Sequence, residues 1–267
     1  MTKNSYSSLL KKQRKMYLNH LKEESNSYSN LIKNQKLLLN LFRSNWINQQ
    51  RQELKDFCDE ITDIADSIAK VGWPLAPELD YRDVKTWLDA GLHDNQLNEK
   101  LVEYYTKNNF QKLYKEFDNI ERLMAQDTSS QGYLKQVEKV RSTFQKDNTS
   151  FLITINCIVS IIDYEFINAL GRLDSNEITR HGKVADLERE DEQEEYRNFM
   201  AISSEKALMS FLVFSNFSDG IDQTKFTRHS IQHGRYNPSR LTEGDFVKCV
   251  CLLSSVCYLN KIKKEEN

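Results

Sequence analysis

Glycine and proline are scarce in this chain: 8 glycines and 3 prolines stand among 267 residues. Folds rich in sheets and tight turns need many of both, whereas long helices tolerate few of either. The sequence also shows no series of alternating strands and no internal repeat. The expected fold class is therefore all-α, a helical bundle.

No apolar run at the N-terminus resembles a signal peptide, because "MTKNSYSSLLKKQRKMYLNH" is polar and basic. The longest apolar stretch, residues 151–170, reaches membrane length but contains Asn156, Asp163 and Glu165. Ionisable groups near the middle of a membrane span are costly. We therefore expect a buried helix of a soluble, cytoplasmic protein, with no membrane partner.

Cysteine is sparse too, and its five copies lack the paired spacing of a metal site. Each stands among apolar residues, and three fall within the predicted last helix. We expect reduced thiols that serve as small core residues, as is usual in the cytoplasm. The five are Cys58, Cys157, Cys249, Cys251 and Cys257.

The chain has no large charge of one sign: 37 Lys and Arg stand against 39 Asp and Glu, which gives −2. A globally basic nucleic-acid-binding protein is excluded, so nucleic acid would have to meet a local patch. Residues 1–55 supply one, since 11 Lys and Arg stand there against three Glu and no Asp, a local charge of +8. This basic arm is either an ordinary solvated helix face or a surface that attracts RNA or another acidic partner.

Helical patterns divide the chain into two regions. Residues 6–70 are expected to form one or two long helices, and residues 71–80 mark a break because they hold two of the three prolines. Helical patterns resume at Tyr81 and continue to about residue 147. The expected domains are an N-terminal helical region, residues 1–147, and a second helical domain, residues 148–267.

The second region should begin with the helix at 151–170, which ends near Gly171. A polar, acidic loop follows it, and residues 204–220 then form an apolar helix. Thr242 and Asp245 have the spacing of a capping box, so the last helix should begin there. Because this last helix is apolar along most of its middle, we expect it in the core.

The stretch "TKFTRHSIQHGRYNPSRLTEGDF", residues 224–246, gathers residues that are rare elsewhere: two of five histidines, two of eight glycines and one of three prolines. Gly234 and the proline four residues later cannot continue a helix, so "FTRHSIQHG" is expected to be a short helical segment. His229 and His233, four residues apart, would share one face of it, with Arg228 beside them.

Two imidazoles and an arginine suit the cleavage of an RNA phosphodiester bond. A base must take the proton of the 2′-hydroxyl and an acid must protonate the leaving 5′-oxygen; histidine, with an unperturbed pKa of about 6.5, suits both tasks. Arginine suits the charge that grows on the phosphoryl oxygens, because it is permanently charged and carries a fork of donors. Such a site needs no metal.

Three other interpretations of the residues stay open. Two histidines at H-x3-H spacing on a helix bind zinc in some proteins, but here the Glu of an H-E-x-x-H site and a third ligand are missing. The arginine and the histidines also suit a structural role, as helix caps or as partners of acidic side chains. The third interpretation is a site that binds phosphate without cleaving it.

The segment "TRHSIQHGR", followed by a polar loop and an apolar helix, resembles the R-x4-H signature of the HEPN superfamily of all-helical ribonucleases. It is more closely similar to the "NRHxIxHGR" segment of abortive-infection-like and toxin-like bacterial members. Arg228 and His233 match the defining arginine and histidine, while His229 stands where the wider superfamily often has asparagine. "LITINCIVSIIDYEF" resembles the family's acidic helix, with Asp163 at the matching position. The resemblance covers roughly residues 145–262.

The resemblance implies a C-terminal HEPN-like domain and a metal-independent, cofactor-free endoribonuclease of phage-defence or toxin–antitoxin type. It also implies a homodimer in which two motifs face one cleft. His233 would act as general acid or base, Arg228 would hold the scissile phosphate, Asp163 would orient the motif and His229 would assist. Cleavage would leave a 2′,3′-cyclic phosphate. The partners expected are RNA and an antitoxin or other regulatory protein.

Flanking phosphates would be held by Arg235, by Arg240 and by the lysine of "TKFTR", which is Lys225 beside Phe226. Two other function classes remain: a noncatalytic HEPN-type module that binds RNA or a nucleotide, and a helical protein-interaction protein that assembles through its N-terminal helices.

Reversing the charges of Lys11, Lys12, Arg14 and Lys15 tests the basic arm. If the arm contacts RNA, this change should weaken binding and lower the slope of log affinity against log salt by up to about 3, because each lost phosphate contact removes about 0.7 from the slope. Fluorescence anisotropy with a single-stranded RNA at several salt concentrations measures both quantities. Unchanged affinity would identify the arm as a solvated helix face.

Overall fold

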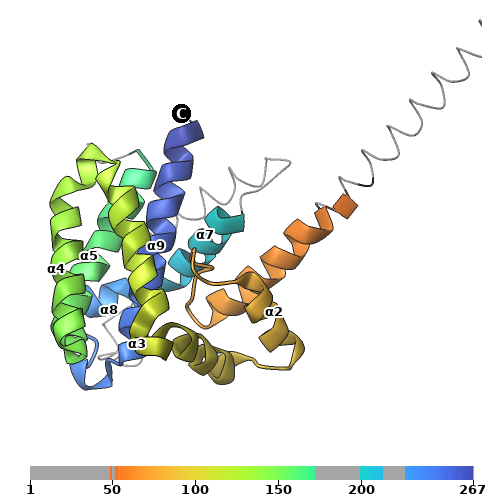
Figure 1. The fold of residues 1–267 in the computed structure, drawn as a ribbon, viewed down its shortest axis with the longest axis horizontal. Helices are drawn as coiled ribbons and strands as arrows, with labels where there is room; N and C mark the ends of the chain where they lie inside the picture. Colours follow the sequence, from red (N-terminus) through yellow and green to blue (C-terminus); the bar gives the residue numbers. More distant parts are fainter. Residues whose placement is uncertain (1–48, 50–51, 54, 172–198, 213–225, 267) are drawn as a thin grey trace, which may run out of the picture. The chain divides into compact units, whose positions relative to one another are not determined.

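The computed structural model describes residues 49, 52–53, 55–171, 199–212 and 226–266. The chain divides into two compact units, Met1–Phe57 and Cys58–Asn267, and the second contains all the elements below. Every regular element among the described residues is a helix, which confirms the all-α fold class (Figure 1). Residues 58–70 are helical. They are followed by α2 (Tyr81–Asp89), α3 (Asp94–Ala125), η1 (Thr128–Ser130), α4 (Gln131–Lys146), η2 (Asn148–Ser150), α5 (Phe151–Ala169), α7 (Phe199–Phe211), α8 (Arg228–Gln232), η3 (Pro238–Arg240) and α9 (Glu243–Glu266).

Helix α9 is the centre of the bundle, and α3, α5 and α7 pack against it (Figure 1). It begins with the predicted capping box: the Asp245 N–H donates to Thr242 Oγ1 at 3.1 Å, and the Thr242 N–H donates to Asp245 Oδ2 at 2.9 Å. Because a helix that is apolar on all sides has no face to offer to water, it must be enclosed. Its buried apolar residues include Phe246, Val247, Val250, Leu252, Leu253, Val256 and Leu259.

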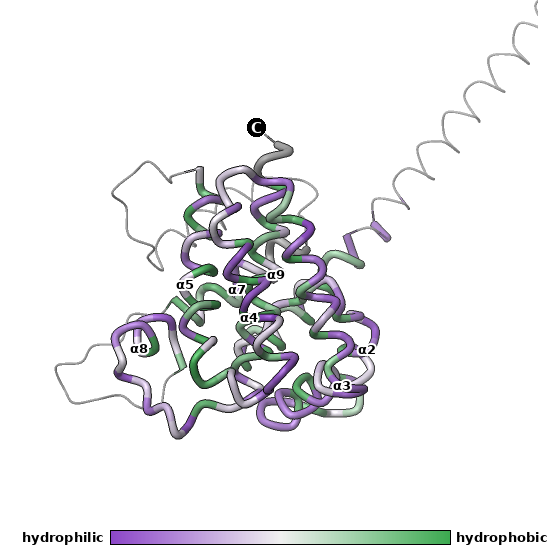
Figure 2. Tube along the Cα trace, turned by 60° about the vertical axis from the view of Figure 1, so that its left-hand side comes forward, coloured by the Kyte–Doolittle hydropathy of each residue, from purple (hydrophilic) through white to green (hydrophobic). Residues whose placement is uncertain are grey.

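The outer helices are amphipathic. Figure 2 shows hydrophilic and hydrophobic residues alternating along the tubes of α3 and α4, as expected of helices with one side in the core. Helices α3 and α4 pack against each other, and α4 packs against α5. The compact unit Cys58–Asn267 therefore includes residues on both sides of position 147, where the sequence analysis divides the chain.

Helix α5 together with the three residues before it (Asn148–Ala169) has the length and composition of a membrane span, with a mean hydropathy of 1.6 over an 18-residue window. In the structure it packs against α4, α8 and α9, and nine of its 19 residues are buried, so the expected burial holds for one side of the helix only. Glu165 and Asn168 lie on its buried side, with 1% and 5% of their surface exposed. Its first turn leaves Leu152 and Ile153 exposed.

The proline-containing break at 71–80 is a buried connection between two helices. Trp73 is fully buried; its indole N–H donates to Asn98 Oδ1 at 2.9 Å and its ring stacks on Tyr105 at 5.8 Å between centroids. Helix α2 begins at Tyr81, as predicted, with Asp80 as its cap. Burial of the tryptophan explains how a segment without helix or strand is held in one place.

Helix α3 contains an interruption that no glycine or proline marks. Lys107 is extended, and the next three residues, Asn108, Asn109 and Phe110, have φ values of 52°, 54° and 62°. Asparagine tolerates this left-handed region, but phenylalanine is strained in it. The Phe110 ring meets the Phe144 ring of α4 edge to face at 5.2 Å, and this packing offsets the strain.

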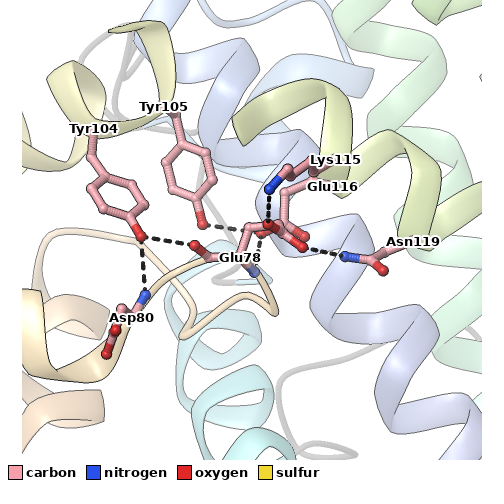
Figure 3. A network of polar contacts seen from close by, with 7 residues as sticks. All are labelled: Glu78, Asp80, Tyr104, Tyr105, Lys115, Glu116 and Asn119. Atoms are coloured by element: carbon pink, nitrogen blue, oxygen red, sulfur yellow. Dashed lines mark hydrogen bonds and ion pairs between the residues drawn. The ribbon is translucent and has the colours of Figure 1, made fainter. Parts of the chain in front are cut away.

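Glu116 of α3 is fully buried and is hydrogen-bonded through both carboxyl oxygens. Oε1 accepts from the Glu78 N–H at 2.9 Å and from the Tyr105 hydroxyl at 3.1 Å (Figure 3). Oε2 accepts from the Ser254 hydroxyl of α9 at 2.6 Å. Burial raises the pKa of Glu116 to about 7, although these hydrogen bonds lower it. One side chain thus joins the 71–80 segment, α3 and α9.

A second buried carboxyl, Glu165 of α5, links α5 to α9 and to the turn before α4. It accepts from the Ser130 hydroxyl at 2.6 Å and from the Asn260 amide at 2.9 Å. Asn168 donates to Asp127 at 2.6 Å beside it. Burial raises the pKa of Glu165, so its proton is held more tightly than in water.

Glu116→Gln should remove a pH dependence of stability. The folded-state pKa of about 7 lies above the ordinary value of 4.5, so the folded state binds more protons between these values. The free energy of unfolding should therefore fall by about 3 kcal/mol as pH rises through this window, and then stay constant. Glutamine is neutral throughout and should lack this fall. Urea unfolding between about pH 4 and pH 8 measures the slope.

The matched control is Glu99→Gln, an exposed glutamate of the same helix, which should leave the slope unchanged. Parallel stability curves for the wild type and Glu116→Gln would contradict the assignment.

Candidate active site

Helix α8 carries the R-x4-H segment and is closed at both ends. Thr227 Oγ1 accepts from the Ser230 N–H at 3.2 Å, and Ser230 Oγ accepts from the Thr227 N–H at 3.1 Å, which completes a capping box. At the other end Gly234 has φ 63°, a left-handed conformation that glycine adopts without strain. Helix α8 ends at Gln232, with His233 as its cap, so the short helical segment predicted before Gly234 is present.

Apolar contacts hold this segment on the bundle. Helix α8 packs against α5, and its Ile231 is buried. The Phe226 ring lies 6.2 Å from that of Phe211 in α7 and meets the Tyr236 ring edge to face at 5.5 Å. Position 226 is therefore an apolar anchor and not a phosphate contact. The lysine expected to hold phosphate, Lys225, lies outside the described residues.

Arg228 forms an ion pair with Asp163 of α5, since Nη2 donates to Oδ2 at 2.6 Å. Their side chains are only 19% and 22% exposed. Arg228 Nε and Asp163 Oδ1 are buried without a hydrogen-bond partner among the described residues. The pair is thus joined by one hydrogen bond and not by the two of a fork, so the guanidinium keeps donors that Asp163 does not use.

This contact brings together two residues that are 65 positions apart and that the HEPN resemblance pairs. It also fits the structural interpretation, in which an arginine bridges to an acidic side chain. The geometry alone is compatible with both.

His229 and His233 lie on one face of α8, as their spacing predicts, with ring centroids 4.5 Å apart and planes inclined by 59°. His229 is partly buried and His233 is exposed. The pKa of His229 is lowered, first by burial and then by the neighbouring His233 and Arg228. A lowered pKa favours the neutral imidazole, which is the form that accepts a proton.

The remaining site candidates, Arg235 and Arg240, are exposed on the chain that follows α8. Figure 2 shows this stretch as mostly hydrophilic. Asn237 caps the short helix η3 by accepting from the Ser239 N–H at 3.0 Å, which fixes the backbone that carries Arg240. Both arginines are thus placed on the solvent side of the motif.

Over the described ranges, no group of three or more His, Cys, Asp and Glu side chains is arranged to hold a metal ion. The zinc interpretation of the two histidines therefore gains no third ligand there. All five cysteines are free thiols, and Cys249, Cys251 and Cys257 are buried in α9.

The chain matches no protein-family model, no curated protein and no solved structure.

Sequence reasoning missed several residues that position the site. Ser230 and Ile231 fasten α8 but look unremarkable in the sequence; only the "T-x-x-S" spacing of Thr227 and Ser230 hints at the cap. Glu165 is two positions from Asp163 and faces the core instead of the motif. Successive residues of a helix turn by about 100°, so positions two apart lie on nearly opposite faces.

A double-mutant cycle tests the ion pair. Arg228→Met and Asp163→Asn should each lower the free energy of unfolding, because each leaves a partly buried partner without its counter-charge. The double variant should lose less than the sum, with a coupling energy of about 1 kcal/mol, which allows for the partial exposure of both side chains. Urea unfolding of the four proteins measures it.

The exposed pair Lys100 and Glu103, whose side chains are 35% and 45% exposed, provides the control cycle and should show no measurable coupling. Strict additivity of Arg228→Met and Asp163→Asn would contradict the pairing.

Proposed function

We propose that this protein is a metal-independent endoribonuclease of the HEPN type, acting in phage defence or in a toxin–antitoxin pair. The observation that carries the proposal is the meeting of Arg228 with Asp163 next to two neighbouring histidines, one on α8 and one at its C-terminal cap. The sequence resemblance anticipates this arrangement. The residue types match the needs of 2′-hydroxyl attack: a proton acceptor, a proton donor and a fixed cation.

In this proposal His233 exchanges protons with the reacting oxygens, because it is exposed at the end of α8. His229, whose lowered pKa keeps it neutral, assists as proton acceptor. Arg228 holds the scissile phosphate with the part of its guanidinium that stays exposed, and Asp163 fixes the direction of the guanidinium. Arg235 and Arg240 hold flanking phosphates. Two copies of the chain bring their motifs to one cleft, and an antitoxin or other regulatory protein controls access.

A second candidate is a noncatalytic module that binds RNA or a nucleotide. The same ion pair favours it, because an arginine held by an acidic partner on a folded helix also suits a fixed phosphate-binding site. The two candidates differ in whether RNA is cleaved.

His233→Ala should lower the cleavage rate by roughly 10²–10⁴-fold, the usual contribution of a general acid or base. Arg228→Ala should lose a comparable factor, and Arg228→Lys should not restore it, because lysine lacks the planar fork. Purified protein with a mixed single-stranded RNA, in excess EDTA, measures the rate and the cyclic-phosphate product. Gln232→Ala, at an exposed position of the same helix, is the matched control and should keep full activity.

The same assay tests whether two protomers contribute residues to one site. A mixture of Arg228→Ala and His233→Ala proteins should regain activity if one protomer supplies the arginine and its partner the histidine. Cleavage at the full rate by His233→Ala alone would contradict the assignment of His233 as general acid or base. RNA binding without cleavage by the wild type would select the noncatalytic candidate.

A further inference from the structure

A small pocket of about 210 Å³ lies where the end of α3, the turn before α4, α5 and α9 meet. Its polar lining consists of Gln126, Asp127, Glu165, Asn260 and Lys261. The pocket is lined by none of the residues proposed for RNA cleavage. Its chemistry therefore belongs to a separate part of the molecule.

The carboxylates of Asp127 and Glu165 gather around the same three neutral groups. The Asn168 amide nitrogen lies 2.6 Å from Asp127 Oδ2 and 3.5 Å from Glu165 Oε2. The Asn260 amide nitrogen lies 2.9 Å from Glu165 Oε2 and 3.5 Å from Asp127 Oδ2. The Ser130 hydroxyl lies 2.6 Å from Glu165 Oε1 and 3.2 Å from Asp127 Oδ2. These three groups hold the two acids together without offsetting their negative charge.

One oxygen of this cluster has no donor. Asn260 is only 5% exposed, it lines the pocket, and its Oδ1 is buried without a hydrogen-bond partner among the described residues. A buried acceptor that is left unpaired is costly, so such an atom is usually satisfied by protein, water or an ion. A cation bound beside Asn260 would supply the missing partner.

The charges around the pocket favour a cation. Burial raises the pKa of Glu165, the hydrogen bonds from Ser130, Asn260 and Asn168 lower it, and Asp127 raises it again. A cation next to both carboxylates would favour their ionised forms. The last turn of α3 also borders the pocket and brings the negative end of the helix dipole. Lys261, which is partly exposed, is the cationic side chain of the lining and opposes this attraction.

The donor atoms suit a hard cation such as Ca²⁺. This ion takes about six to eight oxygen ligands from carboxylates, amide oxygens and water, at about 2.3–2.6 Å, so neighbouring ligands lie about 3–4 Å apart. The groups around the two carboxylates have comparable spacings, from 2.6 to 3.5 Å. The pocket has room for several waters, since one water occupies about 30 Å³. Burial raises the pKa of Cys257, the sulfur at this pocket, so it stays a thiol and is a poor ligand for soft metals.

We propose that this cluster binds a divalent cation of the Ca²⁺ type through Asp127, Glu165 and the Asn260 amide oxygen, with water completing the shell. The ion would link the end of α3 to α5 and α9, so it would stabilise the bundle. Glu165 and Asp163 lie on nearly opposite faces of α5, so the ion takes no part in RNA cleavage. This inference therefore holds or fails independently of the proposed ribonuclease activity.

Calorimetric titration of the EDTA-treated and dialysed full chain with CaCl₂ tests the site. The dissociation constant should be about 10⁻⁴–10⁻³ M, because only two ligands are charged, and the melting temperature should rise with CaCl₂. MgCl₂ should bind at least about tenfold more weakly, because Mg²⁺ gives up its waters reluctantly. Asp127→Asn and Glu165→Gln should each weaken Ca²⁺ binding by at least about tenfold, since each removes half of the ligand charge.

Asp147→Asn is the matched control and should bind Ca²⁺ like the wild type. Asp147 caps η2 through the Thr149 N–H and hydroxyl at 2.9 and 2.7 Å, just as Asp127 caps η1 through the Ser129 N–H and hydroxyl at 3.0 and 2.7 Å. It does not line the pocket. The two aspartates thus differ in their contacts with the cluster and not in their capping role.

Lys261→Met is the second variant, because it keeps both carboxylates and removes the opposing charge. It should tighten Ca²⁺ binding by about threefold, and it decides the test if circular dichroism shows that neither acid variant folds. The proposal is overturned if CaCl₂ at about 10 mM produces neither binding heat nor a rise in melting temperature. It is also overturned if Mg²⁺ binds as tightly, if folded Asp127→Asn and Glu165→Gln bind Ca²⁺ like the wild type, or if Lys261→Met fails to tighten binding.

Discussion

The enclosure of α9 is the constraint on which the rest of the structure depends. A helix that is apolar along its middle is stable in water only when other helices surround it. Helices α3, α5 and α7 supply that surround, and each turns an apolar side inward. Two carboxyl groups that enter this interior have partners on α9: Glu116 accepts from Ser254, and Glu165 accepts from Asn260. These hydrogen bonds fix the position of α9 within an otherwise apolar interface, because a shifted helix would leave a buried carboxyl unpaired.

This packing also decides where the motif can lie. With Glu165 turned towards α9, helix geometry directs Asp163 to the outside of α5, where α8 docks. Arg228 meets it there, and the capped helix presents His229 and His233 next to the ion pair. The core thus sets the orientation of α5, and α5 sets the position of the candidate site.

Local signals in the sequence were sufficient for much of this. The scarcity of glycine and proline predicted the fold class; the Thr242 and Asp245 spacing predicted the start of α9; Gly234 predicted the end of α8. Each of these depends on residues a few positions apart, and such effects are readable from a linear pattern.

What the sequence could not show depends on long-range packing. The interruption of α3 has asparagines but no breaker, and only the contact of Phe110 with Phe144 shows why it persists. The raised pKa of Glu116 and the hydrogen bond from Lys248 to the Val71 carbonyl depend on neighbours far away in the chain. Of the candidate site, the pairing of Asp163 with Arg228 was accessible only through family resemblance, because 65 residues separate them.

The three thiols of α9 have a consequence for how this protein responds to chemistry around it. Burial raises the pKa of Cys249, Cys251 and Cys257, so hardly any thiolate is present, and reagents reach them only when the bundle opens. Cys58 and Cys157 are partly accessible and react without such opening. The rate of the slow phase of cysteine alkylation in native buffer therefore measures how often α9 becomes accessible to solvent.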